Sequence, residues 1–156
     1  MIYDGKTFRN DFIHDIQTAK ESAVIFSPYL SGQVCDAFIN RVEETLRRGV
    51  TIRIATIAAD VMEPEYIEGQ TRKIRSLQNH GILMTAVHAK KYDVNYAIID
   101  RHIIWYGNTN LLGKSDEDND VIRIDDAKTA AELLKHAMER SGMQKITHGL
   151  QTRLDV

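Results

Sequence analysis

The chain opens with apolar residues at helical spacing. Phe8, Phe12 and Ile16 recur every four residues, which predicts an amphipathic helix over 7–22 with one stripe packed inward. The charged residues that fall between them are expected on the solvent side of this helix: Arg9, Asp15 and Lys20. The first element is therefore a helix that needs an apolar surface to cover.

The same spacing rules predict the remaining elements. Further helices are predicted over 32–48, 65–79 and 127–140. Strands are predicted over 23–26, 50–56, 82–87, 94–99, 103–106 and 121–124. Strands separated by helices favour parallel pairing, whereas strands in quick succession favour antiparallel pairing. We therefore expect an α/β fold, a sandwich with a mixed, mostly parallel sheet flanked by helices.

Length and composition fit one globular domain. The chain has 156 residues, of which 43% are hydrophobic and 27% charged, enough for one core. We expect this domain to span 1–140. A C-terminal tail over 141–156 contains two glycines and little periodicity, which predicts a weakly ordered extension or a segment that depends on a partner.

Charge and hydropathy limit the functional classes. No window of eighteen uncharged apolar residues occurs, and the N-terminus lacks the pattern of a signal peptide, so we expect a cytoplasmic protein without a membrane partner. The single cysteine, Cys35, is expected to be a small buried side chain. A net charge of −2 does not indicate a strongly electrostatic nucleic-acid binder. Nucleic acid remains a candidate partner through a local basic patch.

The stretch from His88 to Asn110, HAKKYDVNYAIIDRHIIWYGNTN, carries the candidate chemistry. It resembles the signature of the phospholipase D superfamily, in which H-x-K and four residues lead to an Asp, followed by a Gly-Ser-x-Asn turn. The earlier segments AVIFSPYL, RRGV and TIRIAT resemble the N-terminal half of short domains of this superfamily. The resemblance implies phosphodiester hydrolysis through a phosphohistidine, without metal or cofactor. It also implies a homodimer, because a chain with one motif needs a second copy to complete the site.

The motif has two registers, and the first keeps a catalytic set. In it, His88 is the nucleophile, Lys90 the phosphate-binding cation and Asn110 an amide donor, and residues 91–95 bulge out of the pattern. Phosphodiester hydrolysis of this kind needs one neutral imidazole as nucleophile and one protonated imidazole as acid, stabilised by Lys and Asn donors. This register predicts an active, metal-independent phosphodiesterase or nuclease.

The second register counts back from Asp100. It puts Asp93 at the histidine position and Asn95 at the lysine position, so that neither a nucleophile nor a cation is left. Residues 88–92 then form a connection of ordinary length between two strands. Asp93 and Asn95 also share one face of the next strand. These two points favour the degenerate register.

The turn that follows keeps part of the family pattern. Asn108 stands where the superfamily has Ser, between Gly107 and the final Asn110. An amide at this position can bond a phosphate oxygen or satisfy the backbone of its own turn, and both readings stay open.

Three other groups have ordinary structural explanations. The acidic run 116–120 lacks the glycine and distal glutamate of a calcium loop, so a solvated connection is expected and no metal site. The aromatic residues Tyr96, Trp105 and Tyr106 are expected to pack in the core rather than stack on bases. A phosphate-facing patch or a solvated helix face could be formed by the basic residues Arg47, Arg48, Arg53, Arg72, Lys73 and Arg75.

The sequence thus supports three functional hypotheses. The first is a homodimeric phospholipase D-like domain with a degenerate phosphodiesterase site, which binds nucleic acid or a protein partner. The second is an active phosphodiesterase that uses His88, Lys90 and Asn110. The third is a structural dimerisation module.

Overall fold

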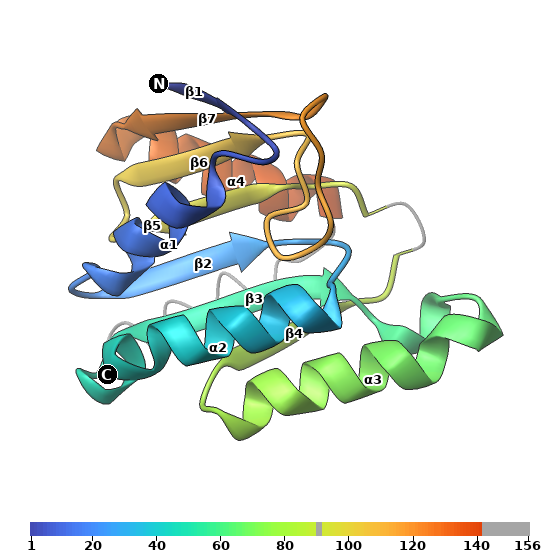
Figure 1. The fold of residues 1–156 in the computed structure, drawn as a ribbon. Helices are drawn as coiled ribbons and strands as arrows, with labels where there is room; N and C mark the ends of the chain where they lie inside the picture. The colour runs from blue at the N-terminus through green and yellow to red at the C-terminus, as the bar shows by residue number, and fades with distance from the viewer. Residues whose placement is uncertain (90–91, 142–156) are drawn as a thin grey trace.

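A computed structural model describes residues 1–89 and 92–141 of the chain. These residues form a single sheet with helices on both faces (Figure 1). The strands are β1 (Ile2–Asp4), β2 (Ser22–Phe26), β3 (Thr51–Ile57), β4 (Leu83–Val87), β5 (Tyr96–Ile99), β6 (Ile103–Gly107) and β7 (Asp120–Asp125). The helices are α1 (Arg9–Gln17), α2 (Gly32–Arg47), α3 (Pro64–Asn79) and α4 (Ala127–Ser141), with a 3-10 turn η1 (Ala59–Val61).

The sheet is mixed, as expected. Its strand order is β1-β7-β6-β5-β2-β3-β4. β2, β3 and β4 pair in parallel, and the remaining pairs, from β2–β5 to β1–β7, are antiparallel. The expectation of mostly parallel pairing is therefore wrong for the described ladder. The reason is that only β2, β3 and β4 are linked by crossover helices, whereas β5 and β6 are joined by a tight turn that reverses the chain.

Element boundaries follow the apolar pattern with two differences. Helix α1 ends at Gln17, not near 22, and the Thr18 hydroxyl bonds the carbonyl of His14 at 2.9 Å at this end. Strand β1 was not predicted, because three residues give too little alternation to detect. It lies at the edge of the sheet, where Ile2 pairs with Ile122 of β7.

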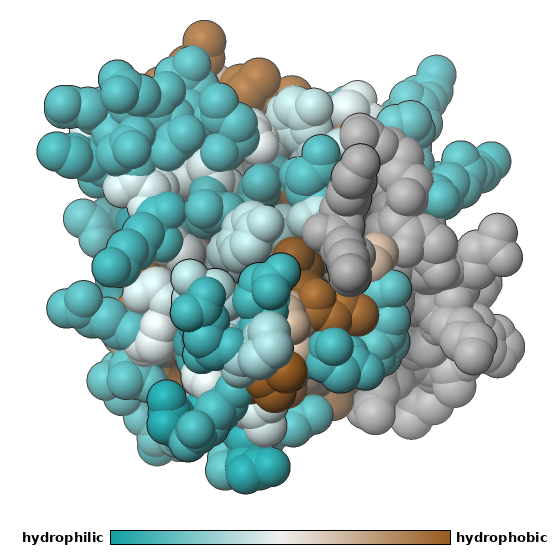
Figure 2. All heavy atoms as spheres, turned by 90° about the vertical axis from the view of Figure 1, so that its right-hand side faces the viewer, coloured by the Kyte–Doolittle hydropathy of each residue, from teal (hydrophilic) through white to brown (hydrophobic). Residues whose placement is uncertain are grey.

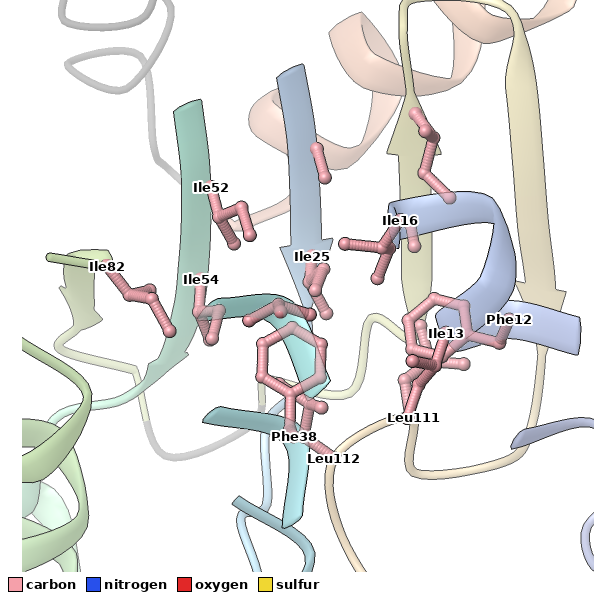
Figure 3. Packing of buried hydrophobic residues seen from close by; sticks show 14 of the residues in the cluster. Phe12, Ile13, Ile16, Ile25, Phe38, Ile52, Ile54, Ile82, Leu111 and Leu112 are labelled. Atoms are coloured by element: carbon pink, nitrogen blue, oxygen red, sulfur yellow. The ribbon is translucent and has the colours of Figure 1, made fainter. Parts of the chain in front are cut away.

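The main core lies between the sheet and helices α1 and α2. Phe8, Phe12 and Ile16 are fully buried, which confirms the predicted stripe of the first helix. Figure 3 shows side chains of α1 and α2 gathered over the isoleucines of β2 and β3. On the opposite face, Ala130 of α4 packs against Ile98 and neighbouring residues. Burying apolar area on both faces supplies the main stabilising free energy of such a domain.

Two charged residues of α1 lie inward, contrary to expectation. Asp15 is only 8% exposed, and its carboxylate accepts the indole N–H of Trp105 at 2.8 Å and the Nε–H of Arg123 at 2.7 Å. Arg9 donates to the carbonyl oxygens of Leu111 and Gly113 at 2.7 and 3.0 Å. Helical periodicity could not show this, because the partners come from segments about a hundred residues further along the chain.

The expected burial of Cys35 and Trp105 is confirmed. Cys35 is 2% exposed, and burial raises the pKa of its thiol to about 11, which keeps it protonated and unreactive. Trp105 is fully buried among Tyr3, Phe8 and Phe12. Within the described residues, no helix combines the length and apolar character needed to cross a bilayer.

Candidate phosphodiesterase site

A hollow of about 610 Å³ lies where β5 begins, β6 ends and β7 begins. Figure 1 shows β2 and β6 pointing toward this end of the sheet. Figure 2 views the molecule from this end, with hydrophobic atoms near the centre and hydrophilic side chains around them. The residues that line the hollow are Asp93, Asn95, Tyr106, Gly107, Asn108, Asp120 and Ile122. The hollow therefore brings Asp93, Asn95 and Asn108 together.

Gly107 makes the close approach of β6 and β7 possible. A Cβ atom at this position would lie 2.0 Å from the carbonyl oxygen of Asp120 and 2.8 Å from the Cα of Val121. No side chain fits at these distances, so the glycine of the turn is required by packing alone. Its presence is consequently no evidence for a catalytic turn.

Asn108 uses its amide oxygen within the fold. The backbone N–H of Asp120 donates to Asn108 Oδ1 at 2.9 Å, and the backbone N–H of Asn108 donates to the carbonyl of Asp120 at 3.2 Å. The side chain thus continues the β6–β7 ladder by one bond. This arrangement favours the reading in which the asparagine satisfies its own turn, and it leaves only the Nδ2 donors for a ligand.

Asp93 and Asn95 flank the hollow just before β5. Asp93 is exposed, Val94 is buried and Asn95 is half-buried, so the polar pair lies on one side of the chain. Asn95 Nδ2 donates to the carbonyl of Asp93 at 3.5 Å, while Asn95 Oδ1 is buried without a hydrogen-bond partner among the described residues. The two positions contribute a carboxylate and an amide.

Asp100 lies at the other end of β5 and has a structural role. Its carboxylate accepts the backbone N–H groups of Lys20, Glu21 and Ser22 at 2.9, 2.7 and 3.1 Å. Partial burial raises the pKa of Asp100, but these three donors outweigh it and hold the pKa below its usual value. The carboxylate thereby ties the segment between α1 and β2 to the β5–β6 turn.

His88 and Asn110 are not among the residues that line the hollow. The Nδ1 of His88 lies 3.0 Å from Oδ1 of Asp60, and both side chains are largely exposed. Asn110 instead donates from Nδ2 to the carbonyl of Lys114 at 3.4 Å. No hydrogen bond joins His88 to Asn110 in the described part of the chain, and Lys90 lies outside the described residues.

The described lining of the hollow limits its chemistry. Asp93 and Asp120 are carboxylates, Asn95 and Asn108 are amides, and Tyr106 supplies a phenol. Carboxylates at a phosphate-sized site repel the substrate, and amides cannot serve as leaving-group acids. Asp120, expected as part of a solvated acidic connection, lines the hollow, because the pairing of Gly107 with Val121 places it directly beside the turn.

Arg47 and Arg72, two of the basic residues named from the sequence, are paired with carboxylates of their own helices. Arg47 is 2.8 and 3.0 Å from the carboxylates of Glu43 and Glu44, and Arg72 is 3.5 Å from that of Glu68. Arg48 donates to the carbonyls of Gln17 and Ala19, which leaves its positive charge in place. The acidic run 116–120 forms a hydrogen bond within itself: the backbone N–H of Asp118 donates to Asp116 Oδ1 at 3.1 Å.

No grouping of three or more His, Cys, Asp and Glu side chains suited to a metal ion occurs among residues 1–89 and 92–141. Tyr96 is buried as expected, and Tyr106 stacks on it with ring centroids 4.7 Å apart while remaining 41% exposed.

Comparisons with known proteins give the fold and the family. Nuc from Salmonella typhimurium, a phospholipase D family member, superposes with a TM-score of 0.69 at 16% identity, covering 92% of this chain and 95% of that one. NucT from Helicobacter pylori gives a TM-score of 0.66 at 15% identity, covering 89% and 92%. The archaeal chromatin protein TrmBL2, whose structure shows a novel mode of DNA binding, gives 0.59 at 13% identity, covering 90% of this chain and 50% of that one.

At these identities the structural matches show the fold alone. No curated protein matches the chain by sequence. The sequence model of the family described as "Cardiolipin synthase, PLD-like domain" matches residues 12–141, most of the chain. This chain therefore belongs to the phospholipase D-like domain family.

Proposed function

We propose that this protein is a catalytically silent phospholipase D-like domain that forms a homodimer and acts by binding. The observation that supports the proposal is the lining of the hollow at the start of β5, which includes Asp93 and Asn95. Counting back from Asp100 in the sequence assigns the histidine and lysine positions of the motif to these same two residues. His88 lies beside Asp60 instead.

The chemistry of hydrolysis supports this proposal. A phosphohistidine route requires an imidazole that attacks phosphorus and cations that stabilise the pentacovalent state. Asp93 and Asp120 add negative charge where the route needs positive charge. The change from His and Lys to Asp and Asn therefore removes the nucleophile and reverses the preference of the site for a phosphate.

An uncovered apolar surface supports dimerisation. Ile2 pairs with Ile122, and Ile122 pairs with Tyr106, so the three side chains share one face of β1, β7 and β6. Ile124 lies on the same face, two residues from Ile122. Ile2, Tyr106 and Ile124 are 73%, 41% and 37% exposed. This surface adjoins the hollow, which suits a second copy that covers both.

Hydrolysis assays test the loss of catalysis. We expect the full chain to show no turnover of bis(p-nitrophenyl) phosphate or of DNA in EDTA, with no difference between the wild type and His88→Ala. Turnover that His88→Ala abolishes would instead establish the active alternative built on His88, Lys90 and Asn110. The variant Asp60→Ala serves as a control, because it removes the partner of His88 but leaves the imidazole in place.

Nucleic acid is a second candidate partner, favoured by one specific observation. TrmBL2, which shares the fold, is a chromatin protein with a described mode of DNA binding. Arg47 and Arg72 are paired with carboxylates of their own helices, so these two arginines should attract DNA only weakly. Retention of DNA on the wild-type protein that falls steeply between low and moderate salt would favour this partner. Retention independent of salt, or none, would favour a protein partner.

A further inference from the structure

A second hollow, separate from the candidate phosphodiesterase site, lies beside the first half of α3. It has a volume of about 790 Å³ and lies between α3 and the segment that follows β2. The residues that matter here are Tyr29, Met62, Glu63, Glu65, Tyr66 and Gln70. Tyr66 and Gln70 are four residues apart and so share one face of the helix.

Two tyrosines that line this hollow are more than half exposed. Tyr29 is 55% exposed and Tyr66 is 60% exposed. Met62 and Val61 are partly buried beside them and give the hollow an apolar side. Exposed aromatic faces next to apolar side chains offer stacking surface for a flat group, and an aromatic face attracts a cation.

The charges of the hollow favour a cation. Glu68 is 3.5 Å from Arg72, and Lys73 Nζ donates to the carbonyl of Leu30 at 2.8 Å, so these groups have partners. Glu63 and Glu65 have no ion pair within the described chain. Lys73 keeps its positive charge, since a carbonyl partner does not neutralise it, and the N-terminus of α3 adds about half a positive charge. These charges offset most of the two carboxylates, so that a small excess of negative charge remains.

Gln70 adds a buried acceptor without a donor. Its side chain is 1% exposed, and its Nε2 donates to Thr56 Oγ1 at 3.2 Å and to the carbonyl of Ile57 at 2.8 Å. Because a carbonyl can only accept, the amide cannot be turned around. Its Oε1 therefore has no hydrogen-bond partner among the described residues.

We propose that this hollow binds a guanidinium group carried on a short aliphatic chain. The flat cation stacks on a tyrosine, its N–H groups pair with Glu63 and Glu65, and its chain lies along Met62. A guanidinium suits the site better than an ammonium because it is planar and offers five donors. The carrier is either a free small molecule or an arginine side chain of a peptide.

Isothermal titration calorimetry at low salt tests this proposal with butylguanidinium, its neutral isostere butylurea, and the peptide Gly-Arg-Gly. We expect saturable binding of butylguanidinium to the full chain, at least tenfold tighter than butylurea. Tighter binding of the peptide than of butylguanidinium identifies a polypeptide as the carrier, and the reverse identifies a small molecule. Equal affinity for butylguanidinium and butylurea, or no saturation by either, would overturn the proposal.

Surface variants locate the binding. We expect the double variant Glu63→Gln, Glu65→Gln and the variant Tyr66→Ala each to weaken butylguanidinium binding at least tenfold. Glu132→Gln is the matched control, since Glu132 is an exposed helical glutamate on α4, across the sheet. Thermal unfolding of each variant checks that it remains folded. Weakening of equal size in Glu132→Gln would show general charge attraction and refute a site at α3.

Discussion

At the scale of single residues, Asp15 is the side chain on which several elements depend. Its carboxylate accepts one N–H of Trp105 and two of Arg123, at 2.8, 2.7 and 3.1 Å. Its bonds to Arg123 raise the pKa of that guanidinium. The carboxylate thereby joins α1 to β6 and β7 through groups that are mostly out of water.

Replacing Asp15 with alanine should destabilise the protein strongly. The change leaves a buried indole N–H and a partly exposed guanidinium without their acceptor, so we expect a loss of about 2–3 kcal/mol in the free energy of unfolding. Urea denaturation followed by Trp105 fluorescence measures it. Asp36→Ala, at an exposed position of α2, should change the stability by less than about 0.5 kcal/mol. Equal effects of the two substitutions would contradict the assigned role of Asp15.

Asp100 should make the stability depend on pH. Since its pKa is lower in the folded state than in the unfolded state, it stabilises the fold above its unfolded pKa of about 3.9, and this contribution is lost as the pH falls through the folded pKa.

The variant Asp100→Asn should therefore be less stable than the wild type at pH 7 by roughly 1–2 kcal/mol. The difference should shrink as the pH is lowered from about 5 to about 2, because the wild-type carboxylate becomes protonated there. Denaturation at a series of pH values checks this, and a difference that stays constant would rule out the three backbone bonds as its source.

At the scale of elements, the junction of β6 and β7 depends on one glycine. In Gly107→Ala the added Cβ would lie 2.0 Å from the Asp120 carbonyl oxygen, so the two strands must separate. We expect a loss of about 3 kcal/mol in unfolding free energy. Gly32→Ala is the matched control because nothing lies within 4 Å of its added Cβ at the start of α2. It should stabilise the protein by about 0.5 kcal/mol.

Helices and strands were predictable where buried positions recur at a regular spacing in the sequence. The apolar runs gave β2 to β7, and the helical stripes gave α2, α3 and α4 to within a residue or two. The balance of parallel and antiparallel pairs was not predictable, because strand order depends on contacts between distant segments. The burial of Asp15 could not be predicted for the same reason. Its partners, Trp105 and Arg123, belong to other elements that lie far along the chain.

At the scale of the whole molecule, the proposed homodimer can be tested on the face formed by β1, β7 and β6. We expect Ile124→Glu to shift the wild-type dimer toward a monomer in sedimentation velocity experiments, because it places a charge on the face to be covered. Ile67→Glu on α3 is a matched control, since both isoleucines are 37% exposed. A dimer that survives Ile124→Glu but is lost in Ile67→Glu would place the interface at α3.

The candidate site was predictable in part. Counting from Asp100 selected Asp93 and Asn95, the turn at 107–110 selected Asn108, and all three line the hollow. The count could not show that Asn108 bonds Asp120, nor that His88 lies beside Asp60, because both partners belong to other elements. No sequence motif marks the hollow beside α3, because its lining combines the loop after β2 with one face of the helix.

The pairing of β1 with β7 has a consequence for synthesis on the ribosome. β1 pairs in the described sheet with β7 alone, through Ile2 and Ile122. Arg9 likewise bonds the carbonyls of Leu111 and Gly113, which lie about a hundred residues later in the chain. The segment of β1 and α1 therefore lacks these native neighbours until β7 has been synthesised, whereas β2, β3 and β4 can pair with one another earlier.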